Sequence, residues 1–118
     1  MHIIKPDGTI EERLTDNPEG FELEELQELV GGYLEMVRLD RPVQFKSKRV
    51  LTDEDSANMR PGSDLSPEYT ILVVNEDGKL KGLEHNKLAT TLWQNAMETV
   101  LDDYLVGTVL FVTEEEFQ

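Results

Sequence analysis

The sequence predicts a single α+β domain over residues 1–118, with an antiparallel or mixed sheet and two helices packed on one face. Two observations predict this class. Short apolar runs bounded by turn-forming residues recur along the chain, as they do in the strands of a sheet. Two other segments, residues 21–30 and 84–103, carry apolar residues at helical spacing.

The first expected element is a hairpin over residues 2–14 that forms one edge of the sheet. Apolar residues lie on both sides of Pro6-Asp7-Gly8, a triplet that favours a tight turn. Residues 15–20 contain a proline and a glycine and are interpreted as a loop.

A short amphipathic helix is expected over residues 21–30, because acids fill its first turn, where the helix dipole favours them, and leucines recur at helical spacing. Gly31 and Gly32 follow directly. Glycine adopts positive φ without a Cβ clash, so this pair is expected to end the helix.

The middle of the chain predicts four strands. Residues 33–39 and 43–51 are expected to form two of them, divided at Asp40-Arg41-Pro42. Residues 69–74 are an almost continuous apolar run and predict a central strand buried on both faces. A turn at residues 75–78 is expected to connect this strand to a further strand over 79–83, so that the two form a second hairpin. Residues 52–68 are polar, contain two prolines and a glycine, and predict a long loop or insertion.

A long helix is expected over residues 84–103, with Asn86 as its N-cap and Trp93 packed on the sheet. Residues 104–112 predict the last strand, with Gly107 as a bulge, and residues 113–118 predict an acidic tail. The expected element order is therefore β-β-α-β-β-β-β-α-β.

The net charge of the chain disfavours some classes of function. It carries 25 acids and 11 bases, and its formal charge of −14 opposes direct binding to nucleic acid or to an anionic membrane. One basic strip, residues 36–51, interrupts the acidic sequence, and its plain interpretation is pairing with acidic neighbours or a solvated strand face. No cysteine, signal-peptide core or run of about 20 apolar residues is present, so a cytoplasmic location is expected.

No catalytic signature is present. There is no cysteine nucleophile and no nucleophile-elbow motif, and only His2 and His85 offer an imidazole. The acids at 53–55 lack the glycine of a calcium loop, and Gly78-Lys79 lacks the upstream glycine of a phosphate-binding loop. We therefore expect no catalytic residue, no metal and no cofactor, and a binding protein rather than an enzyme.

The run Val-Gly-Gly-Tyr-x-Glu at residues 30–35, followed later by the helix start Asn-x-x-Ala-Thr at 86–90, resembles a family of small uncharacterised proteins. Phages and plasmids carry this family, which is classed as a domain of unknown function. The resemblance covers residues 22–39 and 70–112. It implies a mobile-element accessory protein, frequently encoded among genes that counter host defences, and it implies no biochemical activity.

These two motifs supply the candidate ligand-binding residues. Tyr33 and Glu35 share one strand face, and the first N–H groups of a helix favour an anion. If the motifs meet in space, they form a polar pocket lined by Gly31, Gly32, Tyr33, Glu35, Arg38, Asn86, Lys87 and Thr90. The alternative is structural: the glycines end a helix, Tyr33 packs, Glu35 pairs with a lysine and Asn86 caps its helix.

Three functions stay open on the sequence. The first is a phage- or plasmid-type binding protein that counters host defence by sequestering a small anionic, nucleotide-like signal, which would act in the host-cell cytoplasm. The second is an acidic DNA mimic that inhibits a basic, nucleic-acid-binding host protein. The third is a small hydrolase whose carboxylates the sequence does not single out. A homo-oligomer is compatible with each.

Overall fold

The computed structural model describes residues 1–45 and 66–117. In this part of the chain a five-stranded antiparallel sheet runs in the spatial order β2-β1-β5-β4-β3. The strands are β1 (His2–Ile4), β2 (Ile10–Glu12), β3 (Leu34–Val43), β4 (Tyr69–Asn75) and β5 (Val109–Val112), and the helices are α1 (Leu23–Val30) and α3 (Lys87–Ala96). The predicted α+β class with an antiparallel sheet is confirmed.

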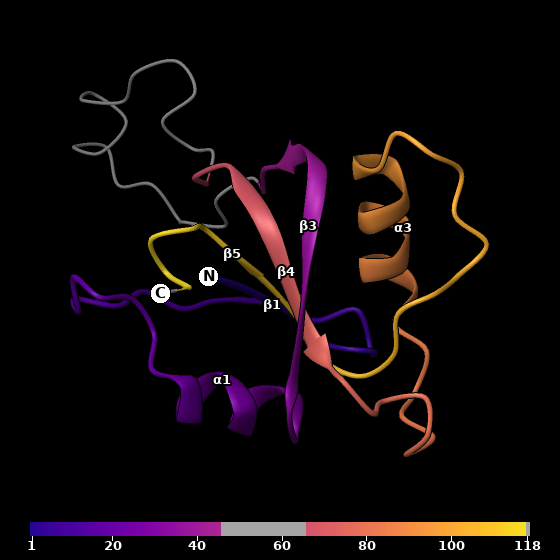
Figure 1. The fold of residues 1–118 in the computed structure, drawn as a ribbon, viewed down its shortest axis with the longest axis horizontal. Coiled ribbons are helices and arrows are strands. Elements are labelled where there is room, and N and C mark those ends of the chain that lie inside the picture. The colour runs from indigo at the N-terminus through magenta and orange to yellow at the C-terminus, as the bar shows by residue number, and fades with distance from the viewer. Residues whose placement is uncertain (46–65, 118) are drawn as a thin grey trace, which may run out of the picture.

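The two helices cover opposite faces of the sheet, so the prediction that both pack on one face is wrong (Figure 1). Successive side chains of a strand point to opposite faces, and β5 and the middle of β4, residues 71–74, are apolar at every position. In β4, Leu72 and Val74 join the apolar cluster that contains α3, whereas Ile71 and Val73 join the cluster that contains α1. A strand buried on both faces needs cover on both faces, and each helix supplies one.

The first half of the fold follows the predicted elements. β1 and β2 form the expected hairpin, with Ile4 opposite Ile10 and β2 at the sheet edge. α1 ends where the diglycine predicts: Gly31 has a φ of +82° and donates its N–H to the carbonyl of Gln27.

A single strand, β3, runs through Asp40-Arg41-Pro42, where a break between two strands was predicted. Because β3 lies at the sheet edge, Pro42 is tolerated there, and the pairing with β4 shifts register between Arg38 and Val43. Most of the second predicted strand, residues 46–51, and most of the predicted loop, residues 52–65, lie outside the described residues.

Several predictions in the second half are wrong. Residues 76–82 form successive turns, so the strand predicted at 79–83 and the second hairpin do not exist. The helix that starts after Asn86 ends at Ala96 rather than near residue 103. Its apolar repeat fails at Val100, which is fully exposed, and Met97 already has extended backbone. Gly107 has a φ of +72°, but it lies before β5 and so does not form the predicted β-bulge within that strand.

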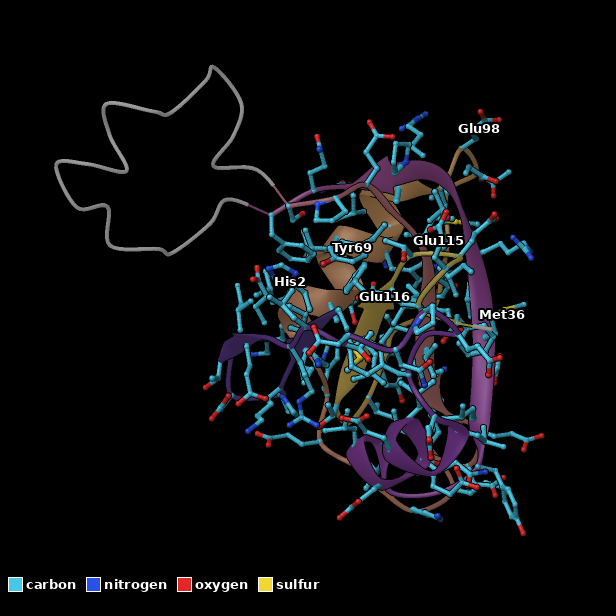
Figure 2. All side chains as sticks on the ribbon, turned by 90° about the vertical axis from the view of Figure 1, so that its left-hand side faces the viewer. His2, Met36, Tyr69, Glu98, Glu115 and Glu116 are labelled. Atoms are coloured by element: carbon cyan, nitrogen blue, oxygen red, sulfur yellow. The ribbon has the colours of Figure 1, made fainter. Side chains whose placement is uncertain are left out.

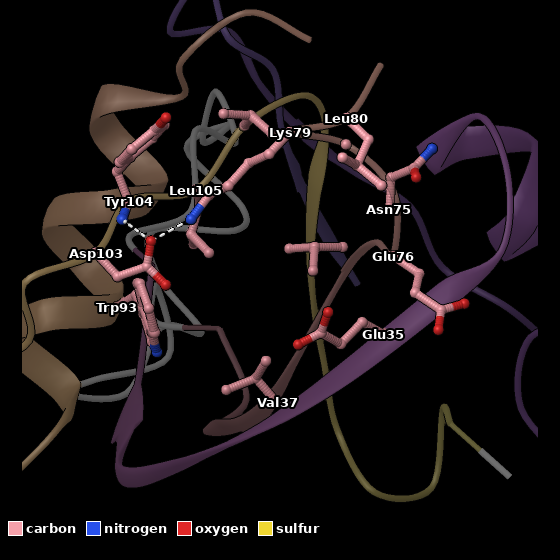
Figure 3. Close-up of a pocket in the computed structure, with 13 residues that line it drawn as sticks. Glu35, Val37, Asn75, Glu76, Lys79, Leu80, Trp93, Asp103, Tyr104 and Leu105 are labelled. Carbon is pink, nitrogen blue, oxygen red and sulfur yellow. Dashed lines mark hydrogen bonds and ion pairs between the residues drawn. The ribbon is translucent and has the colours of Figure 1, made fainter. Parts of the chain in front are cut away.

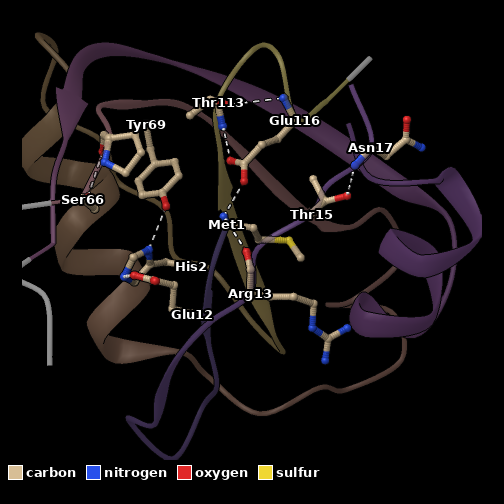
Figure 4. Close-up of polar contacts among 11 residues, drawn as sticks. Met1, His2, Glu12, Arg13, Thr15, Asn17, Ser66, Tyr69, Thr113 and Glu116 are labelled. Atoms are coloured by element: carbon tan, nitrogen blue, oxygen red, sulfur yellow. Dashed lines mark hydrogen bonds and ion pairs between the residues drawn. The ribbon is translucent and has the colours of Figure 1, made fainter. Parts of the chain in front are cut away.

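The predicted acidic tail is folded against the sheet rather than free. The carbonyl of Glu116 accepts the N–H of Phe21, and Phe117 packs against the α1 side of the core. The carboxylate of Glu116 lies 2.6 Å from the buried α-amino group of Met1, and it also accepts the N–H of Thr113 (Figure 4). None of the helices in residues 1–45 and 66–117 has the length and apolar character needed to cross a bilayer.

Candidate ligand-binding site

A pocket of about 200 Å³ lies between the β3–β4 side of the sheet and α3 (Figure 3); we call it the α3 pocket. Its walls come from β3, from the end of β4 with the turns that follow, from α3 and from the segment before β5. The residues that line it are Glu35, Val37, Val74, Asn75, Glu76, Gly78, Lys79, Leu80, Trp93, Asp103, Tyr104, Leu105 and Val106.

The turns after β4 bring Lys79 to the pocket. The side-chain oxygen of Asn75 accepts the N–H of Asp77 at 2.8 Å, which starts the first turn. Gly78 is buried, and a Cβ atom there would lie 2.9 Å from a methyl carbon of Val106. Glycine therefore allows the turn to lie this close to the segment before β5.

The early end of α3 supplies the facing wall. After Ala96 the chain leaves the helix and returns beside it, and the side chain of Gln94 donates to the carbonyl of Asp103 at 2.9 Å. This return places Asp103 and Tyr104 at the pocket. The premature helix end is thus what creates this wall.

Trp93 contributes a polar atom with no partner. Its side chain is only 8% exposed and packs in the α3 cluster, yet its Nε1–H has no hydrogen-bond partner among the described residues. A buried donor without a partner costs about 1–3 kcal/mol. Figure 3 shows the indole in the pocket wall with its nitrogen on the side of Val37. The Nε1 atom itself has almost no surface open to solvent, so an acceptor bound in the pocket reaches it only when this wall moves slightly.

The charged groups of the pocket are mostly acidic. Asp103 accepts hydrogen bonds from the Lys79 ammonium and from the N–H of Tyr104, and these two bonds, the first above all, hold the pKa of Asp103 below its usual value. The same ammonium lies 4.5 Å from the centroid of the Tyr104 ring. Glu35 and Glu76 are exposed at the pocket, and neither forms an ion pair within residues 1–45 and 66–117.

The ionisable groups of the lining are three carboxylates, one lysine and one tyrosine. The lining has no histidine, serine, threonine or cysteine that a base could activate. His85 lies nearby, with its Nε2 atom 3.4 Å from the hydroxyl of Thr90 and its ring edge-on to Tyr104, but it does not line the pocket. Within the described residues no group of three or more His, Asp or Glu side chains is placed to hold a metal ion.

One of the eight residues predicted to bind a ligand, Glu35, lines the α3 pocket. Gly31 and Gly32 lie at the end of α1, where the side chain of Asn75 donates to the carbonyl of Val30 at 3.0 Å. Tyr33 is 70% exposed, so the alternative that it packs is wrong.

The polar groups of Asn86 and Thr90 are used within the fold. Asn86 is fully buried: its side chain caps α3 and donates to the carbonyls of Ile4 and Gly107 at 2.9 and 2.8 Å. The Thr90 hydroxyl donates to the carbonyl of Asn86 at 2.7 Å and accepts the N–H of Leu105 at 2.9 Å. The predicted N-cap is confirmed, and neither side chain faces a solvent-filled pocket.

Arg38 and Lys87 are exposed, and Arg38 pairs with Glu114 at 2.9 Å. The diglycine ends α1 on one face of the sheet, whereas Asn86 begins α3 on the other. The structure therefore does not bring the two predicted motifs together around one hollow.

The sequence interpretation missed most of the residues that form the α3 pocket. Trp93 was expected on the sheet but not in a pocket wall, and Lys79 and Tyr104 were assigned to strands. The only sequence signal for this site is that the chain contains one tryptophan, on a helix face, followed by an acid and a tyrosine at residues 103 and 104.

A second polar cluster surrounds His2 (Figure 4). Its Nδ1 atom lies 2.9 Å from the Tyr69 hydroxyl, its Nε2 atom lies 3.5 Å from Glu12, and its ring stacks on Phe45. Burial lowers the pKa of His2 and raises the pKa of Tyr69 above its usual value. Both side chains are buried and partnered, so this cluster is part of the core.

The fold and the α3 pocket define a small α+β protein with a pocket on one face of its sheet. Comparison with protein-family models, curated proteins and solved structures finds no match for this chain. The resemblance to phage and plasmid proteins therefore depends on the quoted sequence motifs alone.

Proposed function

We propose that this chain is a non-enzymatic accessory binding protein that sequesters a small, ring-bearing ligand in the α3 pocket. The unpartnered Nε1–H of Trp93 in the pocket wall is the observation that carries the proposal. A folded protein satisfies nearly all of its buried polar groups, so a lone donor beside a hollow indicates an absent acceptor. The proposed setting, a phage or plasmid protein acting against host defence in the host cytoplasm, is supported by the sequence resemblance only.

The volume of the pocket limits the ligand. A cavity of about 150 Å³ holds benzene, and sites for drug-sized molecules start near 300 Å³. At about 200 Å³, the α3 pocket accommodates one ring system. A nucleotide-like signal would therefore enter by its base, and its phosphates would lie outside.

A ligand screen with two readouts tests the proposal. Purified protein is mixed with nucleosides, cyclic and ADP-ribose-derived nucleotides and one-ring heterocycles, and the melting midpoint is measured, because a ligand held only by the folded state must raise it. In parallel, proton–nitrogen NMR follows the indole N–H, which gives one signal because Trp93 is the only tryptophan. A bound acceptor should move this signal, and a screen in which neither readout moves would refute the proposal.

A pair of neighbouring substitutions on β3 controls for location. Val37 lines the pocket, whereas Met36 lies on the other strand face and projects to the surface (Figure 2). Val37→Phe should fill the pocket and abolish both responses, and Met36→Phe should leave them unchanged. Equal loss in both variants would place the binding elsewhere.

An acidic DNA mimic is the second candidate. The described residues hold 21 of the 25 acids but 7 of the 11 bases, and exposed carboxylates gather on α1 and on the segment after β5 (Figure 2). Such a surface would bind a basic protein in a strongly salt-dependent way. The test is displacement of duplex DNA from a basic DNA-binding enzyme, which Val37→Phe should not affect and Glu22→Gln, Glu24→Gln and Glu28→Gln together should weaken.

A further inference from the structure

We infer that the occupant of the α3 pocket is an organic cation whose ring also carries a hydrogen-bond acceptor. This inference rests on the proposed function, since it names the ligand class of the same pocket. Three independent features of the pocket support it: a cation that the chain itself supplies, two acids without a partner, and one donor without a partner.

The first feature is the environment of Lys79. Its ammonium binds the carboxylate of Asp103 and lies 4.5 Å from the centroid of the Tyr104 ring. An aromatic face beside a carboxylate is the arrangement that proteins use to hold ammonium and other organic cations. Since Lys79 is 47% exposed and sits on a turn, a ligand cation can replace it. The lysine thus occupies a site that is complementary to a cation.

The second feature is the negative charge of the pocket that Lys79 does not neutralise. Lys79 offsets Asp103, but Glu35 and Glu76 at the same pocket have no cationic partner within the described residues. Figure 3 shows the carboxylate of Glu35 turned toward the side of the pocket that holds Trp93. The charge of −14 on the whole chain adds a long-range field that attracts cations and repels anions.

The third feature, the buried Nε1–H of Trp93, adds a requirement that charge alone does not. This donor needs an acceptor, such as a carbonyl oxygen or a ring nitrogen. A simple ammonium ion would satisfy the acids and leave the indole unpaired. An anion would satisfy the indole but would face Glu35 and Glu76. A cationic ring with an acceptor satisfies both.

A series of probes with one ring and different charges tests this inference. N-methylnicotinamide is a cation with a carbonyl acceptor, nicotinamide has the same shape without charge, nicotinate is an anion, and N-methylpyridinium is a cation without the acceptor. Affinities are measured by titration calorimetry, and the indole N–H signal by NMR. We expect N-methylnicotinamide to bind about tenfold more tightly than nicotinamide and to move the indole signal, N-methylpyridinium to leave that signal in place, and nicotinate not to bind.

Substitutions in the chain give the complementary test. Glu35→Gln should lower the affinity for N-methylnicotinamide by about threefold. Lys79→Met should raise this affinity by about threefold, because it removes the competing ammonium and keeps the length of the side chain. Glu28→Gln makes the same charge change on α1, at the opposite face of the sheet, and should have no effect.

The outcomes separate the two proposals. Nicotinamide or nicotinate binding as tightly as N-methylnicotinamide, or Lys79→Met failing to strengthen the cation, would overturn the cation inference and leave the proposed function standing. Binding of N-methylpyridinium that equals that of N-methylnicotinamide would overturn the acceptor requirement. If no probe of this series and no compound of the wider screen binds the unaltered protein, the proposed function fails as well.

Discussion

Asn86→Ala should be the most destabilising single substitution of an uncharged polar residue in the described part of the chain. The Asn86 side chain is fully buried and makes three hydrogen bonds, one to an N–H of α3 and two to the carbonyls of Ile4 and Gly107. It thereby ties the start of α3 to β1 and to the segment before β5. Alanine removes all three bonds and leaves the backbone partners buried.

The size of the effect can be worked from these bonds. Loss of an N-cap costs about 1 kcal/mol. Each carbonyl that loses its buried donor adds about 1 kcal/mol, the low end of the usual range because a carbonyl has a second lone pair. The sum of about 3 kcal/mol is a large part of the 5–15 kcal/mol typical of a domain, and it should lower the melting midpoint by about 10 °C.

Urea unfolding followed by circular dichroism measures this free energy directly. Asn95→Ala is the matched control, because Asn95 is exposed on the same helix and should change the stability by less than about 0.5 kcal/mol. Asn86→Asp keeps the capping oxygen but loses both donors, so it should retain only a small part of the stability. An Asn86→Ala protein within 1 kcal/mol of the unaltered chain would refute the reasoning.

Three further predictions concern the backbone, pH and salt. Gly31→Ala should cost about 1–2 kcal/mol in urea unfolding, because residue 31 has positive φ but open space for a Cβ, and an unchanged midpoint would contradict the helix-ending role. Burial holds the pKa of His2 below 6.5, so the folded state binds this proton less readily than the unfolded chain; stability should therefore fall as the pH drops below about 6.5, and His2→Phe should flatten that slope in unfolding curves. Raising NaCl from 0.01 M to 0.15 M shortens the Debye length from about 30 to about 8 Å. At a charge of −14 this should raise the melting midpoint, and a fall would mean that ion pairs outweigh self-repulsion.

Local signals in the sequence were sufficient for much of the fold. The hairpin at Pro6-Asp7-Gly8, the helix end at Gly31 and the cap at Asn86 each depend on the conformation or hydrogen bonding of one or two residues, and each was predicted correctly. The α+β class followed from the spacing of apolar residues. These features are encoded within a few residues of where they occur.

The errors in the predicted secondary structure arose at segments whose conformation depends on tertiary contacts. The helical repeat continues past Ala96, but no surface of the sheet covers Val100, so α3 stops. The segment over residues 76–82 shows an alternation of polar and apolar residues that is also typical of a strand. The close packing of the buried Gly78 against Val106 favours the turn conformation instead. The α3 pocket depends on both of these outcomes, which is why its residues could not be assembled from the sequence.

The order of strands in the sheet has a consequence for how the chain folds. β5 lies between β1 and β4, so in the described part of the chain it is the strand through which the N-terminal hairpin and the β3–β4 pair form one sheet, and its pairing with β1 spans more than 100 residues of chain. Closing so long a loop costs conformational entropy before the strand contacts form. Topologies with such long-range contacts therefore fold slowly for their size. During synthesis on the ribosome, the edge of β1 that pairs with β5 stays unpaired until residues 109–112 emerge, and only then can the two halves of the sheet join.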